Sequence, residues 1–182
     1  MLVAIGVALM YGEVVRARFG LLDDYTFLDL AYITPVIDET GRPINNFIRE
    51  GVFRRIGTID GLAIARLFGL VSIAAVGACL SLTWLRLGAS RFESIAMTLC
   101  LLSLPVFQVV ASWAQLLVAL WPIVFAYFAA RLIEGRPGLS PRRRGLRIGL
   151  ASLLLLAGLM LYQPATMMFF VFVAIDRIAG AA

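Results

Sequence analysis

The chain has 182 residues, of which 62% are hydrophobic and 15% are charged, whereas a soluble domain is about 45–50% apolar and about 25% charged. This composition excludes an ordinary soluble domain and predicts a polytopic membrane protein. The net charge is +5, but the arginines flank apolar runs and form no basic face, so nucleic acid is excluded as a partner.

The first apolar run, residues 2–11, has no basic residue before it and no small-residue cleavage site, which argues against a secretory signal. The run is shorter than the roughly 20 residues of a spanning helix. Two interpretations stay open: the start of the chain is truncated, or a long first helix protrudes from the bilayer at its polar end. Both place a first transmembrane helix at residues 1–19.

A polar segment, residues 20–60, follows this helix. It opens with Asp23-Asp24-Tyr25 and continues through Gly41-Arg42-Pro43. Within residues 44–56, apolar side chains recur at helical spacing with arginines between them. This pattern predicts an amphipathic helix that lies on the membrane surface, with its arginines at the lipid headgroups.

Residues 61–182 are predicted to hold the remaining spans. The clearest lies at residues 61–85, where Arg66, close to the start, can snorkel outward. Gly77 and Ser81 are small residues four apart, a spacing that lets a neighbouring helix approach closely. The next two spans are expected at residues 95–110, with a kink at Pro105, and at residues 114–132.

The last two apolar runs, residues 148–162 and 165–178, are separated by Gln163-Pro164, and each is short for a span. They form either two helices or one helix broken at Pro164. Two are favoured, because Asp176-Arg177 then returns to the cytoplasmic face. We therefore predict a single all-α membrane domain, a polytopic bundle of about six transmembrane helices, with five as the alternative. The chain is expected to be a fragment of a longer protein.

The orientation follows from the arginines. The densest positive cluster lies in the short loop at residues 131–147, and the positive-inside rule places that loop in the cytoplasm. Counting spans back puts residues 86–91 on the same side and residues 20–60 on the outer face. In a bacterium, this is the periplasmic face of the inner membrane.

The adjacent carboxylates are the first candidates for chemistry, because histidine is absent from the chain and catalysis would depend on carboxylates, arginine, tyrosine or amides. In a functional interpretation, Asp23 or Asp24 acts as a general base on an acceptor hydroxyl. The other carboxylate orients it or holds a divalent cation such as Mg²⁺ or Mn²⁺. In a structural interpretation, Asp24 caps a helix and Asp23 is solvated. The residues alone leave both open.

Further polar groups lie on the same predicted outer side. The guanidinium fork of Arg42 can bind a phosphate or a phosphodiester, or it can serve as an interfacial snorkel. Tyr162 and Gln163 place polar groups where two spans meet. Such groups are typical of functional sites in membranes, but any helix hairpin also needs a polar turn.

The order of these motifs resembles the polyprenyl-phosphate-sugar-dependent membrane glycosyltransferases of the GT-C class. A first span is followed by Asp23-Asp24-Tyr25 in an outer loop, then by Gly41-Arg42-Pro43 ahead of an amphipathic helix, and later by Tyr162-Gln163-Pro164 in a hairpin. The similarity is greatest to the Gtr-type O-antigen glucosyltransferases of bacteria and phages. Members of the class are much longer, so this chain would correspond to their N-terminal module.

The resemblance implies that a sugar is transferred, with inversion, from a polyprenyl-phosphate carrier to a hydroxyl of a glycan or protein acceptor on the outer face. It implies that Asp23 or Asp24 is the catalytic carboxylate, assisted in some members by a divalent cation. Arg42 would meet the carrier phosphate, and the other candidates for substrate contact are Tyr25, Tyr162 and Gln163.

The alternative function is a non-enzymatic membrane protein, such as a flippase or transporter subunit for a lipid-linked sugar. A transporter is expected to hold polar groups near the bilayer midplane and paired broken helices. The spans of this chain hold few ionisable residues, and the carboxylates lie at the membrane edge. These features favour surface chemistry over transport.

The orientation can be tested by cysteine substitution in intact cells. Thr40→Cys should react with an impermeant thiol reagent, because residue 40 lies in the predicted outer loop. Ser140→Cys should be protected, because residue 140 lies in the arginine-rich loop. The reverse pattern would overturn the orientation and place the Asp23-Asp24 pair on the cytoplasmic face.

Overall fold

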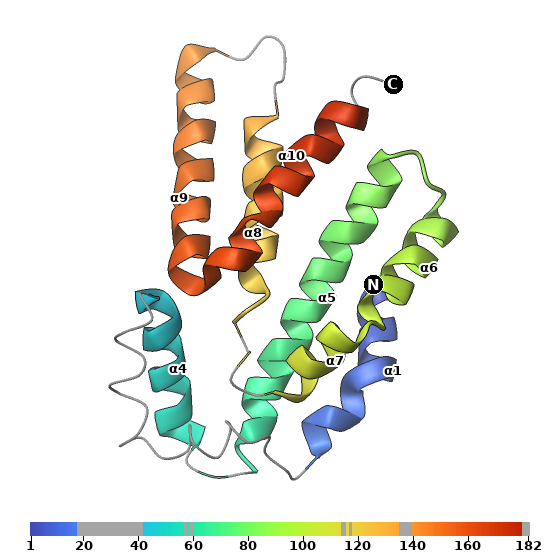
Figure 1. The fold of residues 1–182 in the computed structure, drawn as a ribbon, viewed down its shortest axis with the longest axis vertical. Coiled ribbons are helices and arrows are strands. Elements are labelled where there is room, and N and C mark those ends of the chain that lie inside the picture. The colour runs from blue at the N-terminus through green and yellow to red at the C-terminus, as the bar shows by residue number, and fades with distance from the viewer. Residues whose placement is uncertain are drawn as a thin grey trace.

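The computed structural model describes residues 1–17, 42–56, 58, 60–113, 116, 118–134 and 140–179. Within these ranges the chain consists of α-helices joined by short turns, without a strand (Figure 1). The all-α fold predicted from the sequence is therefore confirmed for the described part of the chain.

One half of the bundle is built around α5, Leu62–Arg86. Along it packs α1, Leu2–Arg16. Two shorter helices, α6, Arg91–Leu102, and α7, Pro105–Ser112, fold back against both α1 and α5. In Figure 1 this half runs from blue α1 through green α5 to yellow α7. Because it is covered from several sides, 56% of the apolar stretch of α5 is buried.

The other half consists of α8, Trp121–Ile133, α9, Pro141–Thr166, and α10, Met168–Ala179. Here α8 is central: it packs against α9 and α10, and it also contacts α5, which joins the two halves. The edge position of α9 in Figure 1 agrees with its exposure, because only 17% of its apolar stretch is buried.

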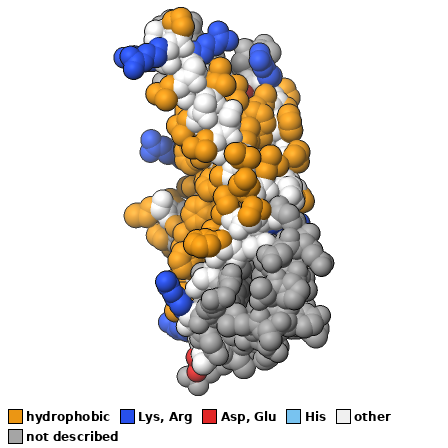
Figure 2. All heavy atoms as spheres, turned by 90° about the vertical axis from the view of Figure 1, so that its left-hand side faces the viewer, with side chains coloured by type: hydrophobic (Ala, Val, Ile, Leu, Met, Phe, Trp, Pro, Cys, Tyr) orange, Lys and Arg blue, Asp and Glu red, His pale blue; other side chains and the backbone are white. Residues whose placement is uncertain are grey.

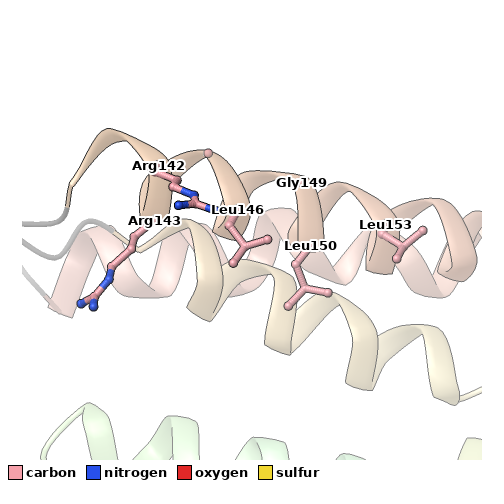
Figure 3. A pocket seen from close by; sticks show the side chains of 7 residues that line it. Arg142, Arg143, Leu146, Gly149, Leu150 and Leu153 are labelled. Atoms are coloured by element: carbon pink, nitrogen blue, oxygen red, sulfur yellow. The ribbon is translucent and has the colours of Figure 1, made fainter.

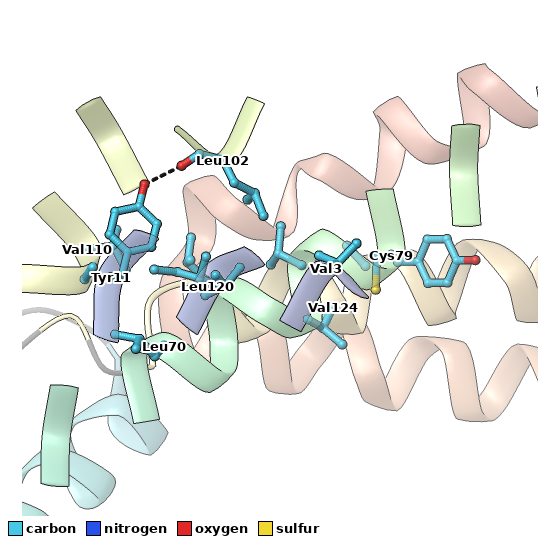
Figure 4. Close-up of a cluster of buried hydrophobic side chains, with 14 of the residues drawn as sticks. Val3, Tyr11, Leu70, Cys79, Leu102, Val110, Leu120 and Val124 are labelled. Atoms are coloured by element: carbon cyan, nitrogen blue, oxygen red, sulfur yellow. Dashed lines mark hydrogen bonds between the residues drawn. The ribbon is translucent and has the colours of Figure 1, made fainter. Parts of the chain in front are cut away.

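A continuous apolar core lies between these helices (Figure 4). It includes Val7 of α1, Ile73 of α5 and Val124 of α8, all of them buried. The hydroxyl of Tyr11 donates a hydrogen bond to the carbonyl oxygen of Leu102. Since α6 ends at Leu102, that carbonyl would otherwise lack a partner in its own helix. The core thus supplies a hydrogen-bond donor to the last carbonyl oxygen of α6 and also buries apolar surface.

The small-residue face predicted on α5 is confirmed. A Cβ atom at Gly77 would lie 2.7 Å from Cγ1 of Val3 and 2.8 Å from Cδ1 of Leu102, so α1 and α6 both approach this backbone closely. One turn further along α5, the Oγ atoms of Ser81 and Ser94 lie 2.8 Å apart. Small side chains therefore let three helices meet, as the spacing predicted.

By length and composition, α5 and α9 can each cross a membrane, with 25 and 26 residues. A third candidate is the α6–α7 pair, which is bent by 67°. With 13 residues, α8 covers only about 20 Å at about 1.5 Å per residue, whereas the hydrocarbon core is about 30 Å thick. The described residues thus contain two or three candidate spans, and the count of six remains a prediction.

Prolines account for the differences between predicted and observed helix boundaries. The span expected at residues 114–132 becomes helix α8 only at Trp121, with Pro122 in its first turn. The arginine-rich segment expected as a loop is helical from Pro141 onward. Proline suits a first helical turn, where no backbone donor is needed. The predicted kink at Pro105 is confirmed as the break between α6 and α7.

An ion-pair cluster joins several helix ends. Nη1 of Arg86 in α5 lies 3.0 Å from Oε2 of Glu134 and 3.6 Å from Oδ1 of Asp176 in α10. Arg131 of α8 also pairs with Asp176, and Nη2 of Arg147 of α9 donates to the carbonyl oxygen of Arg131 at 3.0 Å. These contacts place the ends of α5, α8 and α10 together with the start of α9, as the sequence predicted. The membrane face that this end occupies remains a prediction.

Gly77→Leu should destabilise the fold by about 1–3 kcal/mol, because the new side chain overpacks the contact of α5 with α1 and α6. The measurement is thermal unfolding of the purified chain in detergent. Gly12→Leu is the matched control, since a Cβ at Gly12 meets nothing within 4 Å. Equal loss of stability in the two variants would contradict the packing described for α5.

Candidate functional site

One wall of the candidate site is α4, Pro43–Ile56. The helix predicted at residues 44–56 is therefore present, and it is docked on the bundle. Ile44 and Ile48, one turn apart, pack against a cluster that contains Leu62 and Leu161, whereas Phe47 is 79% exposed. Residues four apart share one face of a helix, so this docking directs part of the apolar face of α4 to protein. Its predicted position on a membrane surface remains a proposal.

The second wall is a break in α9 at Tyr162, whose backbone has φ −160° and ψ 100°. Pro164 explains the break, because proline lacks an N–H and its ring clashes with the carbonyl four residues earlier. The hydroxyl of Thr166 donates to the carbonyl oxygen of Tyr162 at 3.2 Å. Gly158 makes room for this contact, since a Cβ there would lie 2.9 Å from Oγ1 of Thr166. The segment that contains Tyr162 and Gln163 thus departs from regular helix at the end of α9, which packs against α4.

Arg42, Tyr162 and Gln163 meet at this break. Nε of Arg42 donates to Oε1 of Gln163 across 3.5 Å, and Cζ of Arg42 lies 4.7 Å from the centroid of the Tyr162 ring. All three residues are partly buried, so their polar atoms are sheltered but remain accessible. The sequence suggested Arg42 and the Tyr162-Gln163 pair separately, and the structure places them in one cluster.

The guanidinium of Arg42 is oriented in a way that suits an anion. The tyrosine ring lies against it by a cation–π contact, and the glutamine amide occupies Nε. Its Nη1 and Nη2 atoms hydrogen-bond to no other residue that the structure describes. A guanidinium edge of this kind matches two oxygen atoms of a phosphate. The cluster can therefore bind and orient a phosphate group.

Asn45 adds an acceptor close to Arg42. Asn45 lies in the first turn of α4, three residues after Arg42, and is 8% exposed. Its Oδ1 atom is buried and accepts no hydrogen bond within the described structure. A buried polar atom without a partner is costly. The docking of α4 therefore encloses an acceptor that has no donor in the described structure.

Arg66 organises the packing around the start of α5. It is 1% exposed; its Nε donates to the carbonyl oxygen of Ser112 at 3.3 Å, and its Nη1 donates to those of Val14 and Ala17. The last carbonyls of a helix have no partner within the helix, so Arg66 joins the ends of α1 and α7 to α5. The outward snorkel predicted for Arg66 is wrong, because these acceptors hold the side chain inside.

The predicted carboxylates, Asp23 and Asp24, lie outside the described residues, as does Tyr25. The cation site predicted on the two carboxylates therefore also lies outside them. In the described ranges, no group of three or more His, Cys, Asp or Glu side chains is arranged to hold a metal ion. The described part of the site consists of an arginine, a tyrosine and two amides.

Two polar residues of this region were misread or missed in the sequence. A charged side chain within a membrane span is costly and normally faces partners in the protein interior. This rule could have predicted from the sequence that Arg66 points inward. Asn45 stands next to Ile44, whose face turns inward, but helical spacing alone did not show which face would dock. Only the packing of α4 reveals that this amide is buried.

Comparison of the chain with protein-family models, with curated proteins and with solved structures finds no match in any of the three. Function is therefore inferred from the residues and their geometry.

Arg66→Leu should lower the free energy of unfolding by about 1–3 kcal/mol, because partly buried carbonyl oxygens at the ends of α1 and α7 lose their donor. Thermal unfolding in detergent measures the effect. Arg91→Leu provides the control, since Arg91 is an exposed arginine at the start of α6. If the two variants unfold at the same temperature, Arg66 does not hold these helix ends.

Proposed function

We propose that this chain is the N-terminal membrane module of a glycosyltransferase that uses a polyprenyl-phosphate-linked sugar. The module would transfer the sugar to a hydroxyl of a glycan or protein acceptor. The observation that carries the proposal is the cluster of Arg42, Tyr162 and Gln163, which unites residues from two distant parts of the chain. The resemblance of their sequence motifs to the GT-C class supports the same conclusion.

The chemistry of the cluster fits the headgroup of such a donor. The guanidinium of Arg42 would bind the carrier phosphate through its Nη edge. The amide of Gln163 is suited to sugar hydroxyls, which both donate and accept hydrogen bonds. The polyprenyl tail would lie against exposed apolar side chains of the helices, so the donor would stay at the membrane edge.

Asp23 and Asp24 complete the proposed mechanism. One carboxylate would remove the proton from the acceptor hydroxyl as that oxygen attacks the anomeric carbon, and the carrier phosphate would leave. The other would orient the acceptor or hold a Mg²⁺ or Mn²⁺ ion. The proposed location is the periplasmic face of the bacterial inner membrane.

A second candidate function is a flippase or transporter subunit for a lipid-linked sugar. Two broken helices favour it: α6 and α7 are bent by 67°, and α9 is interrupted at Tyr162. Transporters use interrupted helices to form binding sites within the membrane. The glycosyltransferase proposal is preferred, because the predicted spans hold few ionisable residues and the Asp23-Asp24 pair directly follows the predicted first span.

The first test is transfer of labelled sugar from a broad panel of polyprenyl-phosphate donors, in membranes that express the full reading frame containing this chain. Arg42→Gln should reduce kcat/KM by roughly 10- to 100-fold, because a hydrogen bond to a charged group contributes about 1.5–3 kcal/mol. Arg55→Gln is the matched control, since Arg55 is an exposed arginine near the other end of α4. Equal activity in these two variants would remove Arg42 from the donor site.

Asp23→Asn and Asp24→Asn test the carboxylates in the same assay, and loss of transfer in one of them would identify the general base. Normal transfer in both variants would leave Asp24 as a helix cap and Asp23 as a solvated residue. If the wild type transfers no sugar from any donor although the protein is inserted, the flippase or transporter function becomes the better account.

A further inference from the structure

A groove runs along the outer face of α9 (Figure 3). It has a volume of about 880 Å³, with Arg142 and Arg143 at one end and Leu146, Leu150 and Leu153 along its length. An adjoining hollow of about 800 Å³ shares three of these residues and extends to Phe128 of α8. The groove is therefore charged at one end and apolar along the rest.

No described part of the chain fills this groove. Leu146 is 75% exposed and Leu153 is 61% exposed. Gly145 and Gly149 form its floor, and a Cβ atom at either glycine would meet nothing within 4 Å. Figure 2 shows hydrophobic side chains along this side of the molecule, with basic side chains at its upper end. The groove thus has the length and the open floor to hold an extended hydrocarbon chain.

The charge at the end of the groove has no acidic partner in the described structure. Arg142 and Arg143 lie in the first turn of α9, which contains no acidic residue, and neither makes a hydrogen bond or ion pair with a described residue. The first backbone N–H groups of a helix also have no partner inside it, and the helix dipole is positive at this end. Arginines and helix end together favour an anion.

Two arginines near this end of α9 are already engaged. Arg131 pairs with Asp176, and Arg147 donates to the carbonyl oxygens of Arg131 and Glu134. Arg131 thus joins α8 to α10, and Arg147 joins α9 to α8. By contrast, Arg142 and Arg143 project at the start of the groove (Figure 3). Arg142 and Arg143, which have no described partner, therefore place two positive charges at the end of the apolar groove.

We propose that this groove is a binding site for an anionic phospholipid. The phosphodiester lies between Arg142, Arg143 and the first turn of α9, and an acyl chain lies over Gly145 and Gly149, against Leu150. Basic pockets beside membrane helices bind anionic headgroups in this way. The site is at the opposite end of α9 from Tyr162 and does not depend on the proposed glycosyl transfer.

The test is native mass spectrometry of the full chain in detergent, with dimyristoyl phosphatidylglycerol or dimyristoyl phosphatidylcholine added at equal concentration. The wild type should retain the phosphatidylglycerol in preference. Arg142→Gln/Arg143→Gln should weaken its retention by about five-fold for each arginine removed. Arg91→Gln/Arg177→Gln, which removes the same charge from exposed positions on α6 and α10, should retain it normally.

Gly149→Leu gives an independent test, because the open space above Gly149 accepts a side chain without steric conflict. The variant should fold and unfold like the wild type but should lose phosphatidylglycerol. Equal retention in all variants, or equal loss in both arginine pairs, would overturn the proposal. A dimer of the wild type that Gly149→Leu dissociates, without any bound lipid, would instead identify the groove as a contact between two copies of this chain.

Discussion

The bundle depends on how its interrupted helices satisfy their backbone carbonyls. In a hydrocarbon environment an unsatisfied carbonyl is costly, and α1 and α7 both end where their last carbonyls have no helical partner. The buried guanidinium of Arg66 binds both ends. In the same way, the Tyr11 hydroxyl binds the end of α6 at Leu102. Polar side chains from neighbouring helices therefore make the helix breaks possible.

The breaks in turn produce the candidate site. An unbroken α9 would keep Tyr162 and Gln163 within the helix, whereas Pro164 opens the segment that meets Arg42. Docking of α4 through Ile44 and Ile48 supplies the other side. The proposed donor site thus arises where a proline break and a docked amphipathic helix meet, at the opposite end of α9 from the proposed lipid groove.

Four arginines show how environment decides the role of one residue type. Arg66 is enclosed by carbonyl oxygens and is structural. Arg131 is held by the carboxylate of Asp176 and joins two helices. Arg42 and Arg142 have no acidic partner in the described part of the chain, and they are the ones assigned to anionic ligands. Burial and counter-charge, and not the residue type, separate the structural from the ligand-binding arginines.

The all-α class, the helix at residues 44–56, the break at Pro105 and the close contact at Gly77 could be predicted from the amino-acid sequence, because periodicity, proline and small residues act locally. The sequence also selected Arg42, Tyr162 and Gln163 as candidates, although it could not show that they touch. That contact, the inward position of Arg66 and the burial of Asn45 became visible only in the packed helices. These depend on how helices dock across long chain separations, and local sequence patterns do not encode which helix face will be covered.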